Sequence, residues 1–161
     1  MFREVTLPST IKGRLLLHSM PGFQEPLQAS LDAIKRENVT EVLCLTSTRE
    51  VEARAPEYAR AIKASTVGVH VRQFPITDMS ADSDPLAFVA LAKDVATHVQ
   101  RGDTVLAHCA FGIGRTGTVA VLVLMALGIS MSDALDRVMD AGSRAESTVQ
   151  LQLIRALSSE F

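Results

Sequence analysis

Residues 108–117 read HCAFGIGRTG and combine a cysteine, Cys109, with three glycines and an arginine, Arg115. Glycines permit a tight turn in which backbone N–H groups converge on an anion. A helix starting near Arg115 adds unpaired N–H donors and the positive end of its dipole. A planar guanidinium can hold two phosphate oxygens at once, and the same positive field stabilises a cysteine thiolate. These residues therefore predict attack of the Cys109 sulfur on phosphorus, with a covalent cysteinyl-phosphate intermediate.

Other glycine-loop and cysteine motifs fit these residues less well. A Walker A loop ends in Gly-Lys-Ser/Thr, whereas this loop has Gly-Arg-Thr. The three glycines satisfy the G-x-G-x-x-G spacing of dinucleotide-binding proteins, but the next acidic residues, Asp133 and Asp136, fall in a later helix. The sequence has no C-x-x-C redox pair, and an inert buried cysteine would leave Arg115 and the glycines unexplained.

The elements that must position this loop follow from hydrophobic patterning and turn residues. Short apolar runs bounded by turn signals predict strands at residues 13–19, 41–47, 67–76 and 104–109. Helical spacing of apolar residues, first-turn prolines and terminal glycines predict helices at residues 25–37, 56–65, 85 to near 102, 116–127, 132–141 and 147–157.

Strands that alternate with helices of about 10–15 residues imply crossover connections. We therefore expect an α/β fold, with a central, largely parallel sheet of about four to five strands flanked by helices. The apolar runs at 42–45 and 104–107 suit central strands covered on both faces. The cysteine loop follows the second run and precedes the apolar helix 116–127, so it lies where open α/β sheets bind ligands.

Composition bounds the remaining possibilities. The chain has 161 residues, 47% of them hydrophobic, which suits one domain over residues 1–161, with the phosphate chemistry assigned to it by the cysteine loop. A net charge of −2 gives no reason to expect nucleic acid or an acidic membrane as partner. The longest apolar run, 119–127, is shorter than the roughly 20 residues of a membrane span, and the start of the chain lacks a signal-peptide core. We expect a cytoplasmic monomer without metal or cofactor.

The signature His108-Cys109, five residues, then Arg115-Thr116 resembles that of the cysteine-dependent protein tyrosine phosphatase superfamily. The fuller loop is similar to that of the small atypical dual-specificity phosphatases, and the segments GRLLLHSMPG, VLCLTS and FPITD follow the same order. The resemblance implies that Cys109 is the nucleophile, that His108 orients the loop, and that Thr116 donates its hydroxyl to the sulfur. Phosphoryl oxygens would be bound by Arg115 and the backbone of Ala110, Phe111, Gly112, Ile113 and Gly114.

The resemblance also implies a general acid on a loop upstream of the cysteine. Asp78 lies 31 positions before Cys109 and just after the strand predicted at 67–76, so it matches that position. The acid would protonate the leaving oxygen and then accept a proton from water. Asp82 and Asp84 are competitors, although Asp84 is better explained as a helix cap before Pro85 and Asp82 as a solvated loop residue.

Three further residues have weaker signals. Gln150 matches a late glutamine that positions the hydrolytic water in some relatives, but an exposed helix glutamine explains it equally well. Glu146 belongs either to the pocket wall or, as we prefer, to a capping box with Ser143. Cys44 lies in an apolar strand, so we expect it to be a core residue. A protective disulfide with an oxidised Cys109 is a further hypothesis.

The neutral loop interior favours a substrate less charged than a phosphoinositide, because none of residues 110–114 is basic. We expect a phosphatase of phosphotyrosine, and of phosphoserine or phosphothreonine, in proteins or peptides. A phosphatase of a non-protein phosphate, such as an inositol phosphate, a nucleotide or an RNA 5′ end, stays open. A catalytically silent phosphoprotein-binding module is disfavoured, because the cysteine, the arginine and an aspartate are all present.

Overall fold

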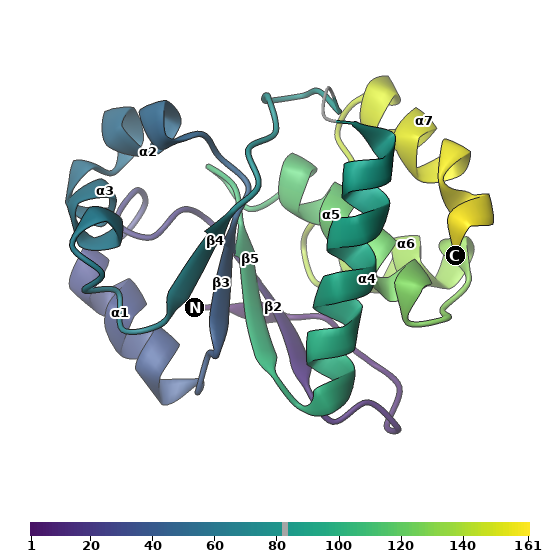
Figure 1. Cartoon of the computed structure of the whole chain (residues 1–161), viewed down its shortest axis with the longest axis horizontal. Coiled ribbons are helices and arrows are strands. Elements are labelled where there is room, and N and C mark those ends of the chain that lie inside the picture. Colours follow the sequence, from purple (N-terminus) through teal and green to yellow (C-terminus); the bar gives the residue numbers. More distant parts are fainter. Residues whose placement is uncertain (82–83) are drawn as a thin grey trace.

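The centre of the protein is a five-stranded sheet with the strand order β1-β2-β5-β3-β4 (Figure 1). The computed structural model describes residues 1–81 and 84–161. The strands are β1 (Arg3–Glu4), β2 (Arg14–His18), β3 (Glu41–Cys44), β4 (His70–Gln73) and β5 (Thr104–His108). The last four run parallel, and only β1 pairs antiparallel, with β2. This confirms the predicted α/β fold with a largely parallel sheet.

Helices cover both faces of the sheet (Figure 1). One face carries α1 (Leu27–Arg36), α2 (Thr48–Arg54) and α3 (Pro56–Lys63). The other carries α4 (Pro85–Arg101), α5 (Gly114–Ala126), α6 (Met131–Asp140) and α7 (Thr148–Ala156), and the short 3-10 turn Ser158–Glu160 follows. Helix α5 is buried along nearly its whole length, as its apolar run predicts. No helix among the described residues is long and apolar enough to cross a membrane.

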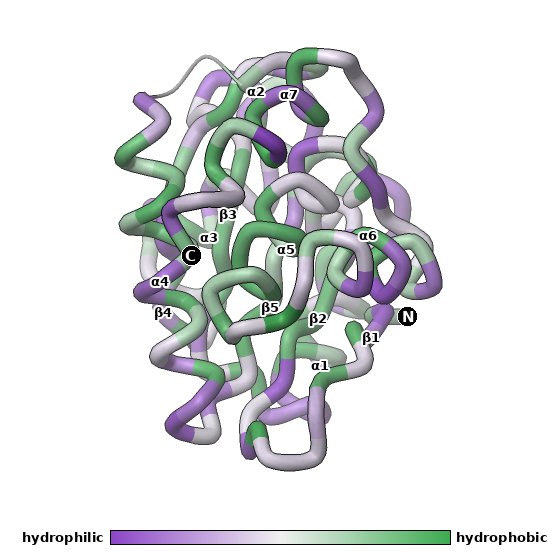
Figure 2. The backbone as a smooth tube through the Cα atoms, turned by 90° about the vertical axis from the view of Figure 1, so that its right-hand side faces the viewer, coloured by the Kyte–Doolittle hydropathy of each residue, from purple (hydrophilic) through white to green (hydrophobic). Residues whose placement is uncertain are grey.

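The sheet separates two apolar clusters, and hydrophobic segments concentrate along its strands and α5 (Figure 2). The cluster beneath α4–α7 contains Cys109, whereas the cluster beneath α1–α3 contains Cys44 and Tyr58. Both cysteines are free thiols. In the sheet register Cys44 lies opposite His108, the residue before Cys109, and the protective Cys44–Cys109 disulfide stays a hypothesis.

Several predicted boundaries are wrong. The strand predicted at 41–47 ends at Cys44, because Ser47 accepts a hydrogen bond from Glu50 N and caps α2, which the sequence patterns missed. The strand predicted at 67–76 is confined to His70–Gln73. Strand β1 was not predicted, and α5 begins at Gly114, two residues earlier than expected.

The capping box predicted for Ser143 and Glu146 is also wrong. The box consists of Ser147 and Gln150: Ser147 Oγ accepts from Gln150 N, and Gln150 Oε1 accepts from Ser147 N. Helix α7 therefore begins one turn later than that pairing requires, and Ser143 is free for a different contact, described below.

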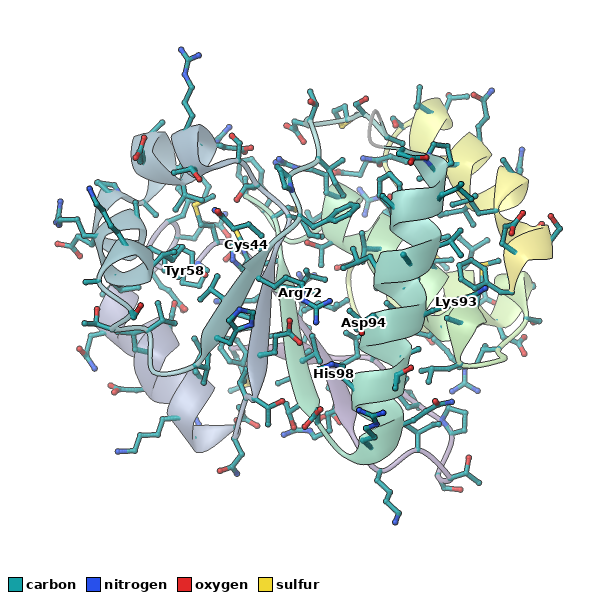
Figure 3. The ribbon with its side chains drawn as sticks, viewed as in Figure 1. Cys44, Tyr58, Arg72, Lys93, Asp94 and His98 are labelled. Carbon is teal, nitrogen blue, oxygen red and sulfur yellow. The ribbon has the colours of Figure 1, made fainter. Side chains whose placement is uncertain are left out.

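A charged network ties the edge strand β4 to its neighbours (Figure 3). Arg72 on β4 donates to the buried carboxylate of Glu41 on β3, with its Nε 2.5 Å from Oε1, and to Asp94 on α4. Charge-assisted bonds of this kind are stronger than neutral ones. The network fixes the strand from which the chain continues to Asp78.

Candidate active site

Residues 109–115, here called the cradle loop, connect β5 to α5 with their carbonyl groups held by partners outside the loop. The carbonyls of Ala110, Gly112 and Ile113 accept hydrogen bonds from Met20 N (3.0 Å), from Ser143 Oγ (2.6 Å) and from Arg144 N (3.3 Å), respectively. Successive peptide groups are planar, so carbonyls drawn outward leave N–H groups facing inward. The unpaired N–H groups at the start of α5 face the same space. This arrangement suits an anion above the Cys109 sulfur.

Close packing requires glycine at Gly112 in the cradle loop and at Gly117 in the first turn of α5. Gly112 has φ +73°, in the left-handed region, and a methyl group there would come within 3.0 Å of the His18 carbonyl oxygen. A methyl on Gly117 would likewise strike the backbone of Arg144. Gly112 N donates to Cys109 Sγ over 3.2 Å, so the same glycine also contacts the sulfur.

Arg115 is the largest fully buried side chain of the protein's described part, and a carboxylate fixes it. Its Nη1 and Nη2 donate to Glu50 Oε2 and Oε1 over 2.7 and 2.9 Å, and Nη1 also donates to Ile76 O over 3.1 Å. Burial opposes the charge of Arg115, but Glu50 and Cys109 outweigh it and raise the Arg115 pKa. Its Nε has no hydrogen-bond partner among the described residues, which leaves a buried donor for an anion.

Asp78 lies beside this guanidinium on an exposed loop. Its Oδ1 is 3.4 Å from Arg115 Nη2 and accepts a hydrogen bond from Met79 N, and its side chain is 57% exposed. The carboxylate is thus adjacent to the cradle, where a general acid for a bound phosphate ester would have to lie. Of its competitors, Asp84 caps α4 by accepting from Leu86 N, as predicted, and Asp82 lies outside the described residues.

His108 is fully buried behind the cradle loop and is held by Tyr58. Its Nδ1 lies 3.2 Å from Cys109 O, and a carbonyl oxygen can only accept, so Nδ1 carries the proton. Nε2 then accepts from the Tyr58 hydroxyl at 3.0 Å. Burial, reinforced by the charge of Arg115, lowers the His108 pKa to about 4, so the ring is neutral at pH 7. Figure 3 shows Tyr58 beside Cys44 on the α2–α3 side of the sheet.

Thr116 and Gln150 each present a buried polar atom without a partner in the described part of the chain: Thr116 Oγ1 and Gln150 Nε2. Gln150 is 1% exposed, so the interpretation as an exposed helix glutamine is wrong. Its Oε1 is used in the capping box and by Glu146 N, which leaves the amide nitrogen as a spare donor. Buried donors of this kind are usually satisfied by water or ligand. Glu146 itself packs against Gly114, and a methyl there would clash with its carboxylate.

Two aromatic rings form one rim of the site. Phe111 is 48% exposed and packs edge-on against Phe23, with ring centroids 5.4 Å apart. The Arg54 guanidinium lies over both rings, at 5.3 Å from the Phe23 centroid and 5.7 Å from the Phe111 centroid. Because Glu50 pairs with both Arg54 and Arg115, this rim is linked directly to the cradle.

Sequence reasoning missed four residues that hold the site: Arg3, Glu50, Tyr58 and Ser143. Glu50 had a local signal, the Ser47-x-x-Glu50 pattern of a helix start, although its carboxylate binds Arg115 rather than the helix end. The other three have none, because Arg3 and Ser143 meet the loop only through the tertiary fold and Tyr58 looks like ordinary core.

Comparisons with known proteins agree with this geometry. The family model described as "Polymorphic toxin system, DSP-PTPase phosphatase" matches residues 18–129. No curated protein matches the chain. Kinase-associated phosphatase, solved with its catalytic cysteine replaced by serine, is similar with a TM-score of 0.85 at 17% identity over 99% of this chain and 94% of that one. The active form of Tk-PTP has a TM-score of 0.74 at 26% identity over 96% and 100%.

A further solved structure, PTPMT1 in complex with PI(5)P, has a TM-score of 0.71 at 16% identity over 91% of this chain and 90% of that chain. At that identity the likeness shows the fold alone. The family match covers more than half of the chain and includes the cradle loop, so the expected superfamily and reaction class are confirmed. The chain belongs to the DSP-PTPase phosphatases of polymorphic toxin systems and is a cysteine-dependent protein phosphatase.

Proposed function

We propose that the chain hydrolyses phosphotyrosine in proteins or peptides, and phosphoserine and phosphothreonine more slowly, through a cysteinyl-phosphate at Cys109. The observation that carries the proposal is the cradle loop, whose outward carbonyls and unpartnered Arg115 Nε leave a set of donors around the Cys109 sulfur. Preorganised donors of this kind stabilise the charge that develops on transferring phosphoryl oxygens.

In the first step the Cys109 thiolate attacks phosphorus, the S–P bond forms and the P–O bond to the leaving group breaks. Asp78 gives its proton to the leaving oxygen. In the second step water attacks phosphorus, gives its proton to Asp78, and the S–P bond breaks to release phosphate and the thiolate. The Thr116 hydroxyl would donate to the departing sulfur, and the Gln150 amide would hold the attacking water; both have a spare buried donor.

Three neighbouring side chains hold the proposed catalytic groups in position. Glu50 fixes the Arg115 fork, and the neutral His108 ring, held by Tyr58, orients the carbonyl of Cys109. Helices α2, α3 and α7, which are far apart in the sequence, thus support one site. This supports the proposal that residues 1–161 act as one phosphatase domain.

The preference for phosphotyrosine rests on the rim. Phe111 and Phe23 offer phenyl surface beside the cradle, and aromatic pairs prefer edge-to-face or offset contacts that a phosphotyrosine ring can make. The exposed charge of Arg54 suits an acidic residue next to the phosphorylated one. A phosphoserine side chain has no aromatic ring, so it cannot make these ring–ring contacts with Phe111 and Phe23.

Hydrolysis of p-nitrophenyl phosphate in excess chelator tests the reaction class. Cys109→Ser should lose all turnover, and persistent activity in that variant would refute the mechanism. Asp78→Asn should lower kcat at least 100-fold, in the range typical of general acid–base catalysis, with little change in KM. Asp84→Asn is the matched control on the same loop, because asparagine caps helices as well as aspartate does.

Substrate class needs a panel compared by kcat/KM. A phosphotyrosine peptide should exceed phosphoserine and phosphothreonine versions of the same sequence, and all should exceed inositol phosphates, nucleotides and an RNA 5′ triphosphate. A higher kcat/KM for a non-protein phosphate would overturn the substrate proposal and leave the reaction class intact.

A further inference from the structure

We propose that Arg3 and Ser143 are positioning residues that together hold the Gly112 carbonyl outside the cradle, so that the N–H of Ile113 faces the bound phosphate. The inference rests on the proposed function, since it assigns the groups that keep the cradle loop in its anion-binding form. It concerns residues from opposite ends of the sequence, 140 positions apart.

The geometry at Gly112 is specific. Its carbonyl oxygen accepts from Arg3 Nη2 and from Ser143 Oγ, each over 2.6 Å, so both of its lone pairs are used. Arg3 Nη1 donates to Gly142 O, which ties the guanidinium to the turn that carries Ser143. Ser143 is 1% exposed. Strand β1 brings Arg3 here through its pairing with β2, where Arg3 faces Leu17.

The hydrogen bonds from Arg3 and Ser143, here called the clamp, are needed because the loop does not fix the Gly112–Ile113 peptide by itself. Glycine adopts positive and negative φ with similar ease, so the Gly112–Ile113 peptide lacks the steric restraint that a side chain would impose. Carbonyl and N–H point in opposite directions across a planar peptide. A rotated peptide would place an oxygen where phosphate oxygens bind and would withdraw the Ile113 donor.

The charge of Arg3 serves the same site. Burial lowers the pKa of Arg3, and the negative charge of the Cys109 thiolate partly restores it. The positive guanidinium that holds the loop thus also favours a thiolate at Cys109. A neutral replacement removes both effects, whereas lysine keeps the charge and loses the planar fork.

The test compares Arg3→Met, Ser143→Ala and the double variant, with Arg137→Met as matched control. Arg137 also ties the N-terminal segment to the rest of the fold, by donating from α6 to Thr6 O over 2.8 Å, and this bond lies outside the cradle loop. The measurement is the Kd for inorganic phosphate in the Cys109→Ser background, from amide shifts in nuclear magnetic resonance, with the Ile113 amide as reporter.

Each single variant should raise the phosphate Kd about threefold to tenfold, the range that one hydrogen bond supplies. The double variant should exceed the product of the two, because one remaining donor still holds the carbonyl in each single variant. Arg3→Lys should lie between Arg3→Met and the parent. The proposal would be overturned if the double variant had a phosphate Kd within twofold of that of Arg137→Met, together with the same Ile113 amide shift.

The same variants with an intact Cys109 separate this result from the proposed function. If the parent enzyme hydrolyses no phosphate ester, the proposed function fails, while the phosphate Kd values still decide whether the clamp exists. Should the double variant prove unfolded by circular dichroism, Ser143→Ala and Arg3→Lys carry the comparison. In them, unchanged phosphate binding relative to Arg137→Met contradicts the inference.

Discussion

The packing of Gly112 against the end of β2 makes a quantitative prediction. Gly112 and Gly128 are two of the six described glycines with positive φ, and they differ in their surroundings. Gly112, with φ +73°, faces the His18 carbonyl, whereas Gly128, with φ +85°, has no heavy atom of the described residues within 4 Å of the position that a methyl group would take. Alanine at Gly128 therefore costs only its backbone conformation, about 1–2 kcal/mol of unfolding free energy. Alanine at Gly112 adds overpacking of about 1–3 kcal/mol, for a total of about 2–5 kcal/mol.

Activity separates the two variants further. Relief of the Gly112 clash requires the cradle loop to move away from His18, and a displacement of about 1 Å in a reacting geometry costs about 100-fold in rate. We expect Gly112→Ala to lose at least that factor in kcat/KM for p-nitrophenyl phosphate, and Gly128→Ala to keep the parent value. Urea unfolding gives the free energies, and steady-state kinetics at 25 °C, where both variants stay folded, give the rates. Equal stability and equal kcat/KM for the two variants would refute the packing argument.

Three other predictions concern groups around the cradle. Glu50→Gln should lower kcat/KM about tenfold, because a charge-assisted bond to Arg115 becomes a neutral one. The neutral His108 ring, with a pKa of about 4, should make the unfolding free energy fall by about 3 kcal/mol between pH 7 and pH 4, because the unfolded chain, with a histidine pKa of about 6.5, takes up the proton first. Phe111→Ala should reduce the kcat/KM ratio of phosphotyrosine to phosphothreonine peptide about fivefold.

Each of these has a control in the chain. Glu52→Gln, on the same helix but directed away from the Glu50–Arg115 pair, should leave kcat/KM unchanged; a drop equal to that of Glu50→Gln would make the effect a property of the helix. His108→Asn should flatten the pH dependence of stability, and an unaltered slope would exclude this ring as its source. Met139→Ala, at another exposed apolar site, should leave the kcat/KM ratio of phosphotyrosine to phosphothreonine peptide unchanged. If Phe111→Ala also leaves that ratio unchanged, the rim does not contribute to the preference for phosphotyrosine.

Local patterns were sufficient for the existence of the four parallel strands, the long helices and the cradle loop. Each of these elements is predicted by a pattern of a few neighbouring residues. The patterns are the apolar runs of β3 and β5, the aspartate and proline at the start of α4, and the unbroken apolar stretch of α5. Helix α2 was missed because Val51 is its single buried residue, so it has no hydrophobic periodicity. Strand β1 has two residues, too few for any pattern.

The supports of the site were beyond sequence reasoning for a different reason. Arg115 and Glu50 are 65 positions apart, and Arg3 and Gly112 are 109 apart, so their pairing exists only once the sheet order is known. Tyr58 on α3 binds His108 at the end of β5, 50 positions away, and no local sequence signal predicts this pairing. The residues proposed to bind the phosphate follow from the sequence of one loop, whereas the residues that hold that loop do not.

The covalent intermediate is the most direct test of the central claim. Rapid acid quench of the enzyme with p-nitrophenyl phosphate, followed by peptide mass spectrometry, should show one phosphoryl group on the peptide containing Cys109 during turnover and none in Cys109→Ser. Steady turnover with no phosphoryl group on Cys109 at any quench time, or with the group on another residue, would contradict the mechanism.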